Sequence, residues 1–241
     1  MASKIKIFLI LLIINNSFLL NSQQYNDDLG PDFHKKKRSE FREKMPSNSV
    51  AIFFTSPVMK RSNDTDFMYH QSPNFYYLTG WREPHGILII YSNQQQDKNG
   101  EYHEQLFIRE RNEYREMWDG KRLGIKGARK MGFDRVYLRS EFIEKELDFS
   151  SFDYVLHNEL RDDVRDNEND NYDLFDLQIK FEKLMSESSN KKKDNELIDN
   201  KRLSINTKTI NDLMKNLRQT KDEEEIELLR KAVKISAFAQ V

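Results

Sequence analysis

The run Ser49–Thr55 constrains the fold of this chain most. Its residues Ser-Val-Ala-Ile-Phe-Phe-Thr place five apolar side chains in succession, over a length typical of one β-strand. A strand with one face in water alternates apolar and polar side chains, which this run does not do. We therefore expect a strand that is buried on both faces.

Other elements follow from local patterns along the chain. Strands are predicted at Asn74–Thr79, Gly86–Tyr91, Glu104–Arg109, Val136–Leu138 and Tyr154–His157. Helices are predicted at Asp32–Met45, Gly124–Met131, Ser140–Leu147, Leu174–Met185, Asn206–Arg218 and Asp222–Val241. Ser140 and Thr207 are the expected N-caps, and Gly132 the expected C-cap. The segments Gln94–Gly100 and Ser186–Asn200 are polar and are expected to be loops.

The first 22 residues have the pattern of an export signal. Lys4 and Lys6 precede the apolar run Ile7–Ile14, which is too short to span a membrane. We expect cleavage near Ser22 and a soluble mature protein without stable membrane association; an uncleaved membrane anchor is the alternative. The chain has no Cys, so its core alone must stabilise it.

Charge and histidine spacing exclude several kinds of site. With 39 basic and 40 acidic residues, the net charge of −1 gives no reason to expect a nucleic-acid partner. The five histidines are neither in an H-E-x-x-H motif nor paired four positions apart, which argues against a zinc site. The acidic run Asp166–Asp170 resembles the start of a calcium loop, but Asn171 and Leu177 stand where an EF-hand needs Gly and Glu.

Two loop segments carry the residues best suited to recognition. These are the turn Arg61–Asp64 and the segment containing Trp118 and Arg122. Aromatic and charged side chains on loops are typical of binding surfaces. A role for Trp118 in the core is the alternative.

Four segments, in this order and spacing, resemble the amino-terminal domain of the aminopeptidase P (Xaa-Pro aminopeptidase) family. They are Arg61–Asp64, Tyr69–Gly80, Met117–Gly124, and Lys221–Ile226 with Arg230–Ala232. The resemblance implies an α/β fold with a mixed β-sheet flanked by helices. It also implies an organisation into a signal peptide at 1–22, the amino-terminal domain at 30–185, a linker with a helix at 186–221, and the start of a truncated pita-bread catalytic domain at 222–241.

The same resemblance implies a two-manganese hydrolase that removes an amino-terminal residue preceding proline. In the family, the metals are held by two Asp, one His and two Glu of the pita-bread domain, and none of these matches a residue here. Trp118 and Asp64 match positions near a neighbouring subunit's active site, so they are the expected substrate-binding residues of a homo-oligomer, a dimer or tetramer. The signal-led start further resembles exported bacterial members, which are periplasmic or extracellular. The alternative is a stand-alone, non-catalytic domain that oligomerises or binds peptides.

Overall fold

A computed structural model of the protein describes residues 29–195 and 203–240. Gly30–Asp222 forms one compact unit, and Glu223–Val241 belongs to a second unit. The predicted signal peptide at 1–22 lies outside the described residues. Within the described part of the chain, no helix is both long and apolar enough to cross a membrane.

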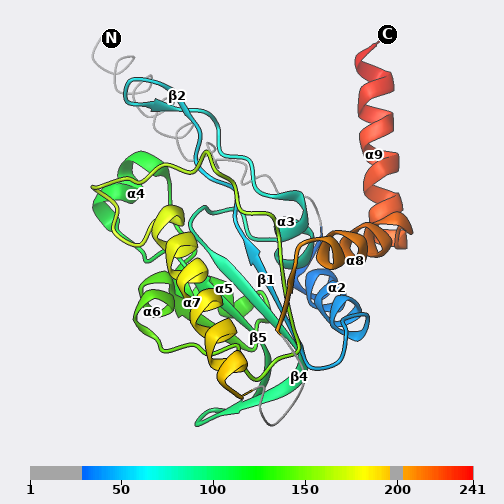
Figure 1. Ribbon diagram of the computed structural model, residues 1–241. Helices are drawn as coiled ribbons and strands as arrows, with labels where there is room; N and C mark the ends of the chain where they lie inside the picture. Colours follow the sequence, from blue (N-terminus) through cyan, green and yellow to red (C-terminus); the bar gives the residue numbers. More distant parts are fainter. Residues whose placement is uncertain (1–28, 196–202, 241) are drawn as a thin grey trace, which may run out of the picture. The chain divides into compact units, whose positions relative to one another are not determined.

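A six-stranded mixed sheet forms the centre of the larger unit, as predicted (Figure 1). Its strand order is β6-β5-β4-β1-β7-β8. The strands are β1 Ser49–Phe54, β4 Ile87–Asp97, β5 Gly100–Ile108, β6 Arg135–Leu138, β7 Tyr154–His157 and β8 Ser204–Asn206. Strand β4 is antiparallel to its neighbours β1 and β5, whereas every other neighbouring pair is parallel.

Helices cover both faces of this sheet, which explains the continuous apolar run of β1. All six residues of β1 are buried. Ala51 and Phe53 pack against α2 Pro31–Glu43, α3 Pro73–Thr79, α5 Gly124–Lys130 and α8 Lys208–Gln219 on one face. Val50, Ile52 and Phe54 pack against α6 Arg139–Glu144 and α7 Leu174–Asn195 on the other. In Figure 1, α7 lies across the near face of the sheet.

The predicted strand at Asn74–Thr79 is wrong, because this segment is helix α3. Ser72 caps it by accepting a hydrogen bond from the backbone N–H of Phe75 at 3.5 Å, and Pro73 occupies the first turn. Gly80 ends it in the left-handed conformation, with φ 66°. Phe75 and Leu78 lie three positions apart on one helix face and are fully buried. Burial of that face therefore outweighs the strand preference of the aromatic residues.

Two of the predicted polar loops are also wrong. Strand β4 continues to Asp97 and β5 begins at Gly100, so 94–100 is mostly the end of a β-hairpin. Asn99 donates its backbone N–H to the side chain of Asp97 at 2.7 Å, which closes the turn. Helix α7 extends through Asn195 rather than ending at Met185, while 196–202 lie outside the described residues. Polar side chains are compatible with a strand and with a helix here, because the end of the hairpin and the last turns of α7 each have a solvent-facing side.

The remaining helices differ from prediction mainly at their ends. Helix α6 begins at Arg139, and the expected cap Ser140 lies inside it; the side chain of Glu141 instead accepts from the backbone N–H of Leu138. Helix α8 packs on the sheet inside the compact unit, rather than lying in a linker. The side chain of Asn206, not that of Thr207, accepts the backbone N–H of Thr209 at its start.

Candidate functional site

The strands β1, β5, β6, β7 and β8 run in the same direction, so their carboxyl ends meet at one edge of the sheet. In open α/β sheets, ligands bind in the space outside this edge. Three long connecting segments leave it: 55–72 after β1, 109–123 after β5, and 158–173 after β7. The first two contain the sequence-predicted residues Asp64 and Trp118. This carboxyl edge is therefore the candidate site.

Asp64 lies in the tight turn of a small β-hairpin. The hairpin consists of β2 Lys60–Ser62 and β3 Thr65–Asp66, and neither strand was predicted. Asn63 adopts a positive φ of 46°, which Asn tolerates better than most residues, and Asp64 is exposed beside it. The hairpin projects from the sheet as the segment labelled β2 in Figure 1. It thus presents a carboxylate to the solvent.

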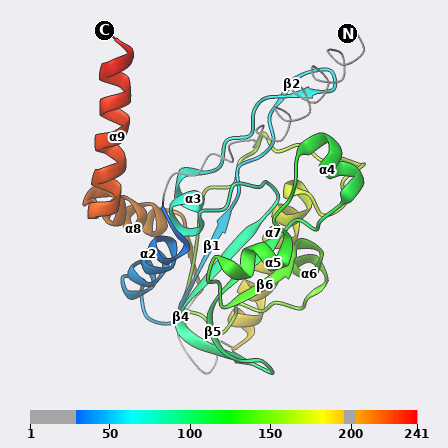
Figure 2. The ribbon, with the colours of Figure 1, turned by 180° about the vertical axis from the view of Figure 1, so that it is seen from behind.

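Trp118 lies near the end of a second projection, the short helix α4 Glu113–Asp119. Asn112 caps this helix through a 3.0 Å hydrogen bond from the backbone N–H of Arg115. The Trp118 side chain is 77% exposed, so the core alternative is excluded; the buried tryptophan is Trp81, at 0%. Both views place α4 and the β2–β3 hairpin at the same end of the sheet (Figures 1 and 2).

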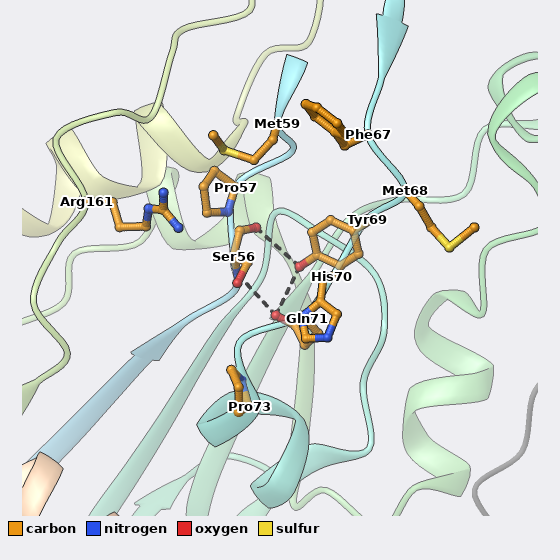
Figure 3. A pocket seen from close by; sticks show the side chains of 10 residues that line it. All are labelled: Ser56, Pro57, Met59, Phe67, Met68, Tyr69, His70, Gln71, Pro73 and Arg161. Carbon is orange, nitrogen blue, oxygen red and sulfur yellow. Dashed lines mark hydrogen bonds between the residues drawn. The ribbon is translucent and has the colours of Figure 1, made fainter. Parts of the chain in front are cut away.

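A cavity of about 470 Å³ lies at the base of the hairpin (Figure 3). Its residues are Ser56, Pro57, Met59, Phe67, Met68, Tyr69, His70, Gln71, Pro73 and Arg161. Met59, Phe67 and Met68 are among the exposed large apolar residues of the chain. On the polar side, the Tyr69 hydroxyl lies 3.0 Å from Gln71 Oε1, which also accepts the backbone N–H of Ser56 at 3.1 Å. The cavity therefore combines an apolar rim with a hydrogen-bonded wall.

Beneath these projections lies a charged layer, in which a buried arginine pairs with two partly exposed carboxylates. The Arg139 side chain is fully buried and binds two carboxylates, with Nη2 3.0 Å from Glu110 Oε1 and 2.6 Å from Asp170 Oδ1. Burial raises the pKa of Glu110, but the hydrogen bonds and charge of Arg139, together with a backbone hydrogen bond, outweigh it, so the pKa lies below the ordinary value. Against the effect of burial, Arg139 also helps to hold the pKa of Asp170 below its ordinary value, so both carboxylates are ionised at neutral pH and the three side chains together carry a net charge of −1.

His85 adjoins this layer as a neutral side chain. Its Nδ1 accepts the backbone N–H of Leu174 at 3.0 Å, so the ring proton belongs on Nε2. Burial lowers the pKa of His85 to about 4, and the nearby Arg139 charge acts in the same direction, whereas Asp170 opposes it. His85 also has a positive φ of 58°.

Comparison with known proteins identifies the domain that carries this edge. Residues 34–148 match the family described as aminopeptidase P, N-terminal domain. A solved structure of Escherichia coli aminopeptidase P with the inhibitor Pro-Leu has a TM-score of 0.65 and 26% identity to this protein. That similarity covers 88% of this chain and 44% of the solved one. This chain contains an aminopeptidase P amino-terminal domain.

Curated relatives of this aminopeptidase P domain are longer proteins. Xaa-Pro aminopeptidase 3 of Dictyostelium discoideum is 33% identical over 121 residues, which is 50% of this chain and 23% of the relative. Xaa-Pro aminopeptidase of Escherichia coli (strain K12) is 34% identical over 108 residues, or 44% of this chain and 24% of the relative. The matches thus span about a quarter of these relatives. Asp64 and Trp118 both lie within the matched residues 34–148.

The described residues of this aminopeptidase P domain contain one group of acidic side chains spaced closely enough for a metal ion. It consists of Asp166, Asp173 and Asp176. Asp173 already accepts backbone N–H groups at both oxygens, from Phe175 at 2.8 Å and Asn167 at 2.9 Å, and so acts as a helix-capping residue. The group lacks the histidine and glutamates of the ligand set that the family resemblance implies. These residues do not fit a two-manganese centre.

Sequence reasoning missed the charged layer at this edge. Glu110, Arg139 and Asp170 come from separate segments and belong to no recognisable motif. Arg109, which directly follows β5, is a further charged residue at the same edge. Only the pairing of β5 with β6 in parallel register, Ile108 beside Leu138, brings Arg109 and Arg139 to the same end of the sheet. A charged residue directly after each of two strands, Arg109 after β5 and Arg139 after β6, is the one sequence signal that could have indicated this.

Proposed function

We propose that this chain is the amino-terminal part of a manganese-dependent Xaa-Pro aminopeptidase whose metal ligands lie outside positions 1–241. The observation that carries the proposal is the match of the domain to aminopeptidase P, both in sequence and in fold. The chain covers 44% of the solved Escherichia coli enzyme, which leaves room for a catalytic domain in the complete protein. When bound, two metal ions would activate a water molecule for attack on the scissile carbonyl.

The role proposed for this domain is to contact the peptide without taking part in bond cleavage. Trp118 is exposed on α4 and Asp64 on the hairpin, and both project from the carboxyl edge. In a homo-oligomer of the complete protein, we propose that they reach a neighbouring subunit's active site. An aromatic ring supplies packing and orientation there, worth about 1–3 kcal/mol when a peptide covers it. Export of the protein to the periplasm or the cell exterior belongs to the same proposal.

The test uses the complete protein that contains this chain, loaded with manganese. We expect it to release the amino-terminal residue from Xaa-Pro peptides, and we expect Trp118→Ala to lower kcat/KM by about tenfold. The matched control is Tyr114→Ala, because Tyr114 is a 68% exposed aromatic residue on the same helix. Metal content should be unchanged in both variants. No turnover by the complete wild-type protein would refute the proposed activity, and equal kinetics of the two variants would refute the role of Trp118.

A further inference from the structure

Three charged groups at the carboxyl edge have buried atoms that lack a partner among the described residues. They are Glu83 Oε2, Arg109 Nε and Arg122 Nε. Glu83 lies between α3 and β4, Arg109 directly follows β5, and Arg122 lies between α4 and α5. Buried polar atoms are almost always hydrogen-bonded in folded proteins. Three such atoms on one edge therefore need an explanation.

The three groups lie close enough to act on one another. Burial lowers the pKa of Arg109; Arg122 lowers it further, and Glu83 opposes both effects. Burial raises the pKa of Glu83. The hydrogen bond from the backbone N–H of Leu123 and the charges of Arg109 and Arg122 act against this rise. One oxygen of Glu83 is used, since Oε1 accepts the Leu123 N–H at 2.6 Å. The other oxygen remains as a free acceptor beside the arginines.

Arg139 takes two of the carboxylates at this edge. Glu110 and Asp170 both bind Arg139, which leaves Arg109 and Arg122 with Glu83. Within the described residues, the buried Nε of Arg109 has no hydrogen-bond partner. Arg122 is 6% exposed and donates Nη1 to the Glu110 carbonyl at 2.8 Å, while its Nη2 lies 3.5 Å from the exposed Asp119 carboxylate. An incoming carboxylate therefore meets two guanidinium groups whose Nε–H groups lack partners.

We infer that Arg109, Arg122 and Glu83 form a binding site for the carboxy-terminal end of a peptide. The two guanidinium groups take the terminal carboxylate, since Arg binds planar carboxylates through its forked N–H groups. Glu83 Oε2 accepts the last backbone N–H of the same peptide. The two arginines are donors and Glu83 Oε2 is an acceptor. The carboxy-terminal end of a peptide offers both a carboxylate and an N–H, whereas a simple anion offers no N–H.

The neighbouring cavity fits the side chain of that last residue. Gln71, which lines the cavity, donates its side-chain N–H to the Glu83 carbonyl at 3.1 Å, so Glu83 adjoins the cavity wall. The opposite rim carries Met59, Phe67 and Met68 (Figure 3). An apolar carboxy-terminal residue is therefore preferred.

The experiment titrates the 241-residue chain with Ala-Pro-Ala-Phe, either as the free acid or as its carboxamide, and follows the arginine Nε–H signals by NMR. We expect the acid to shift the Nε–H signals of Arg109 and Arg122 and to bind at least about tenfold more tightly than the carboxamide. Equal binding of acid and carboxamide would overturn the site. Acetate that binds as tightly as the peptide acid would overturn a peptide as its ligand.

Variants assign the contact to particular residues. Arg109→Gln should weaken binding of the acid at least about tenfold, and Arg109→Lys should also weaken it, because Lys keeps the charge without the forked donors. Arg129→Gln is the matched control, since Arg129 is exposed on α5, and should leave binding unchanged. If Arg161→Gln abolishes binding while Arg109→Gln does not, the carboxylate lies elsewhere and the inference is wrong. The NMR shifts of the unaltered chain decide the question if Arg109→Gln does not fold.

The inference deepens the proposed function, because it names the end of the peptide substrate that this domain would hold. Different experiments would refute the inference and the proposed function. A complete enzyme that cleaves Xaa-Pro peptides with no preference for the free acid would retain the proposed function and refute this site. A chain that binds the acid through Arg109, in a complete protein without peptidase activity, would do the reverse.

Discussion

Arg38 and Glu104 form an ion pair in the interior of the protein. Arg38 Nε lies 2.8 Å from Glu104 Oε2, and the two side chains are 0% and 5% exposed. The remaining nitrogens of Arg38 donate to the carbonyl oxygens of Leu78 and Gly132, at 2.9 and 3.1 Å. The Arg38 side chain of α2 thus contacts β5, the end of α3 and the turn after α5.

We expect Arg38→Ala to lower the free energy of unfolding by about 3–5 kcal/mol, because it leaves the Glu104 carboxylate buried without its partner. Urea denaturation measures this directly. Arg42→Ala is the control on the same helix; Arg42 is half-buried and donates to Ser39, and its loss should cost about 1 kcal/mol or less. Similar losses of unfolding free energy in both variants would show that the buried ion pair stabilises the protein no more than the contacts of Arg42 do.

The stability of the protein should depend on His85 between about pH 6.5 and about pH 4. The pKa of His85 is lowered to about 4 in the folded state, so in this range the unfolded chain binds a proton that the folded chain does not. Stability is therefore full above about pH 6.5 and falls toward about pH 4, by up to about 3 kcal/mol.

His85→Asn should flatten this pH profile. Asn can accept the Leu174 N–H and tolerates the positive φ of position 85. Unfolding curves over the pH range test the change, and His70→Asn, at an exposed position, is the control that should keep the profile of the wild type. An unchanged slope in His85→Asn would refute the role of His85.

Gly80→Ala should destabilise the protein more than Gly120→Ala. Both glycines have left-handed φ values, 66° and 87°. A Cβ atom at Gly80 would lie 2.7 Å from the ring of His34, whereas nothing lies within 4 Å at Gly120. Backbone strain costs about 1–3 kcal/mol at both positions, and the clash adds to it only at Gly80. Thermal unfolding of the two variants gives the difference, and equal shifts would show that His34 moves aside freely.

The two tryptophans should differ sharply in their contribution to stability. Trp81→Ala should lower the free energy of unfolding by about 3–5 kcal/mol because the ring is fully buried in the core. Trp118→Ala should change it by no more than about 0.5 kcal/mol, since the ring is 77% exposed. Chemical denaturation of both variants checks this. A large loss in Trp118→Ala would mean that its effect on activity reflects folding rather than peptide contact.

Manganese should leave the unfolding temperature of the 241-residue chain unchanged. A ligand that binds the folded state tightly raises this temperature by mass action. The acidic group Asp166, Asp173 and Asp176 has its buried member occupied by backbone hydrogen bonds, so we expect no tight site there. Calorimetry that finds stoichiometric binding with micromolar affinity would contradict this, and Asp176→Asn would then test whether the acidic group is responsible.

Local sequence predicted the interior of the fold better than its edges. The six buried residues of β1 and the apolar runs of β7 and the first half of β4 were assigned correctly, because these strands have covered faces and carry continuous apolar side chains. The segment Asn74–Thr79 was assigned wrongly, although Ser72, Pro73 and Gly80 are helix-boundary residues. Its aromatic content favours a strand locally, and only packing of Phe75 and Leu78 against the sheet decides for a helix.

Through its resemblance to the aminopeptidase P family, the sequence predicted a mixed sheet flanked by helices and indicated Asp64 and Trp118 as the side chains to examine. These conclusions depend on short segments whose spacing along the chain carries the information. Only the tertiary structure decided that Trp118 is exposed, that Trp81 is buried, and that Glu83, Arg109 and Arg122 lie together. The reason is physical: burial and the pairing of charges depend on which strand ends meet at one edge of the sheet, and this follows from strand order rather than from any local pattern.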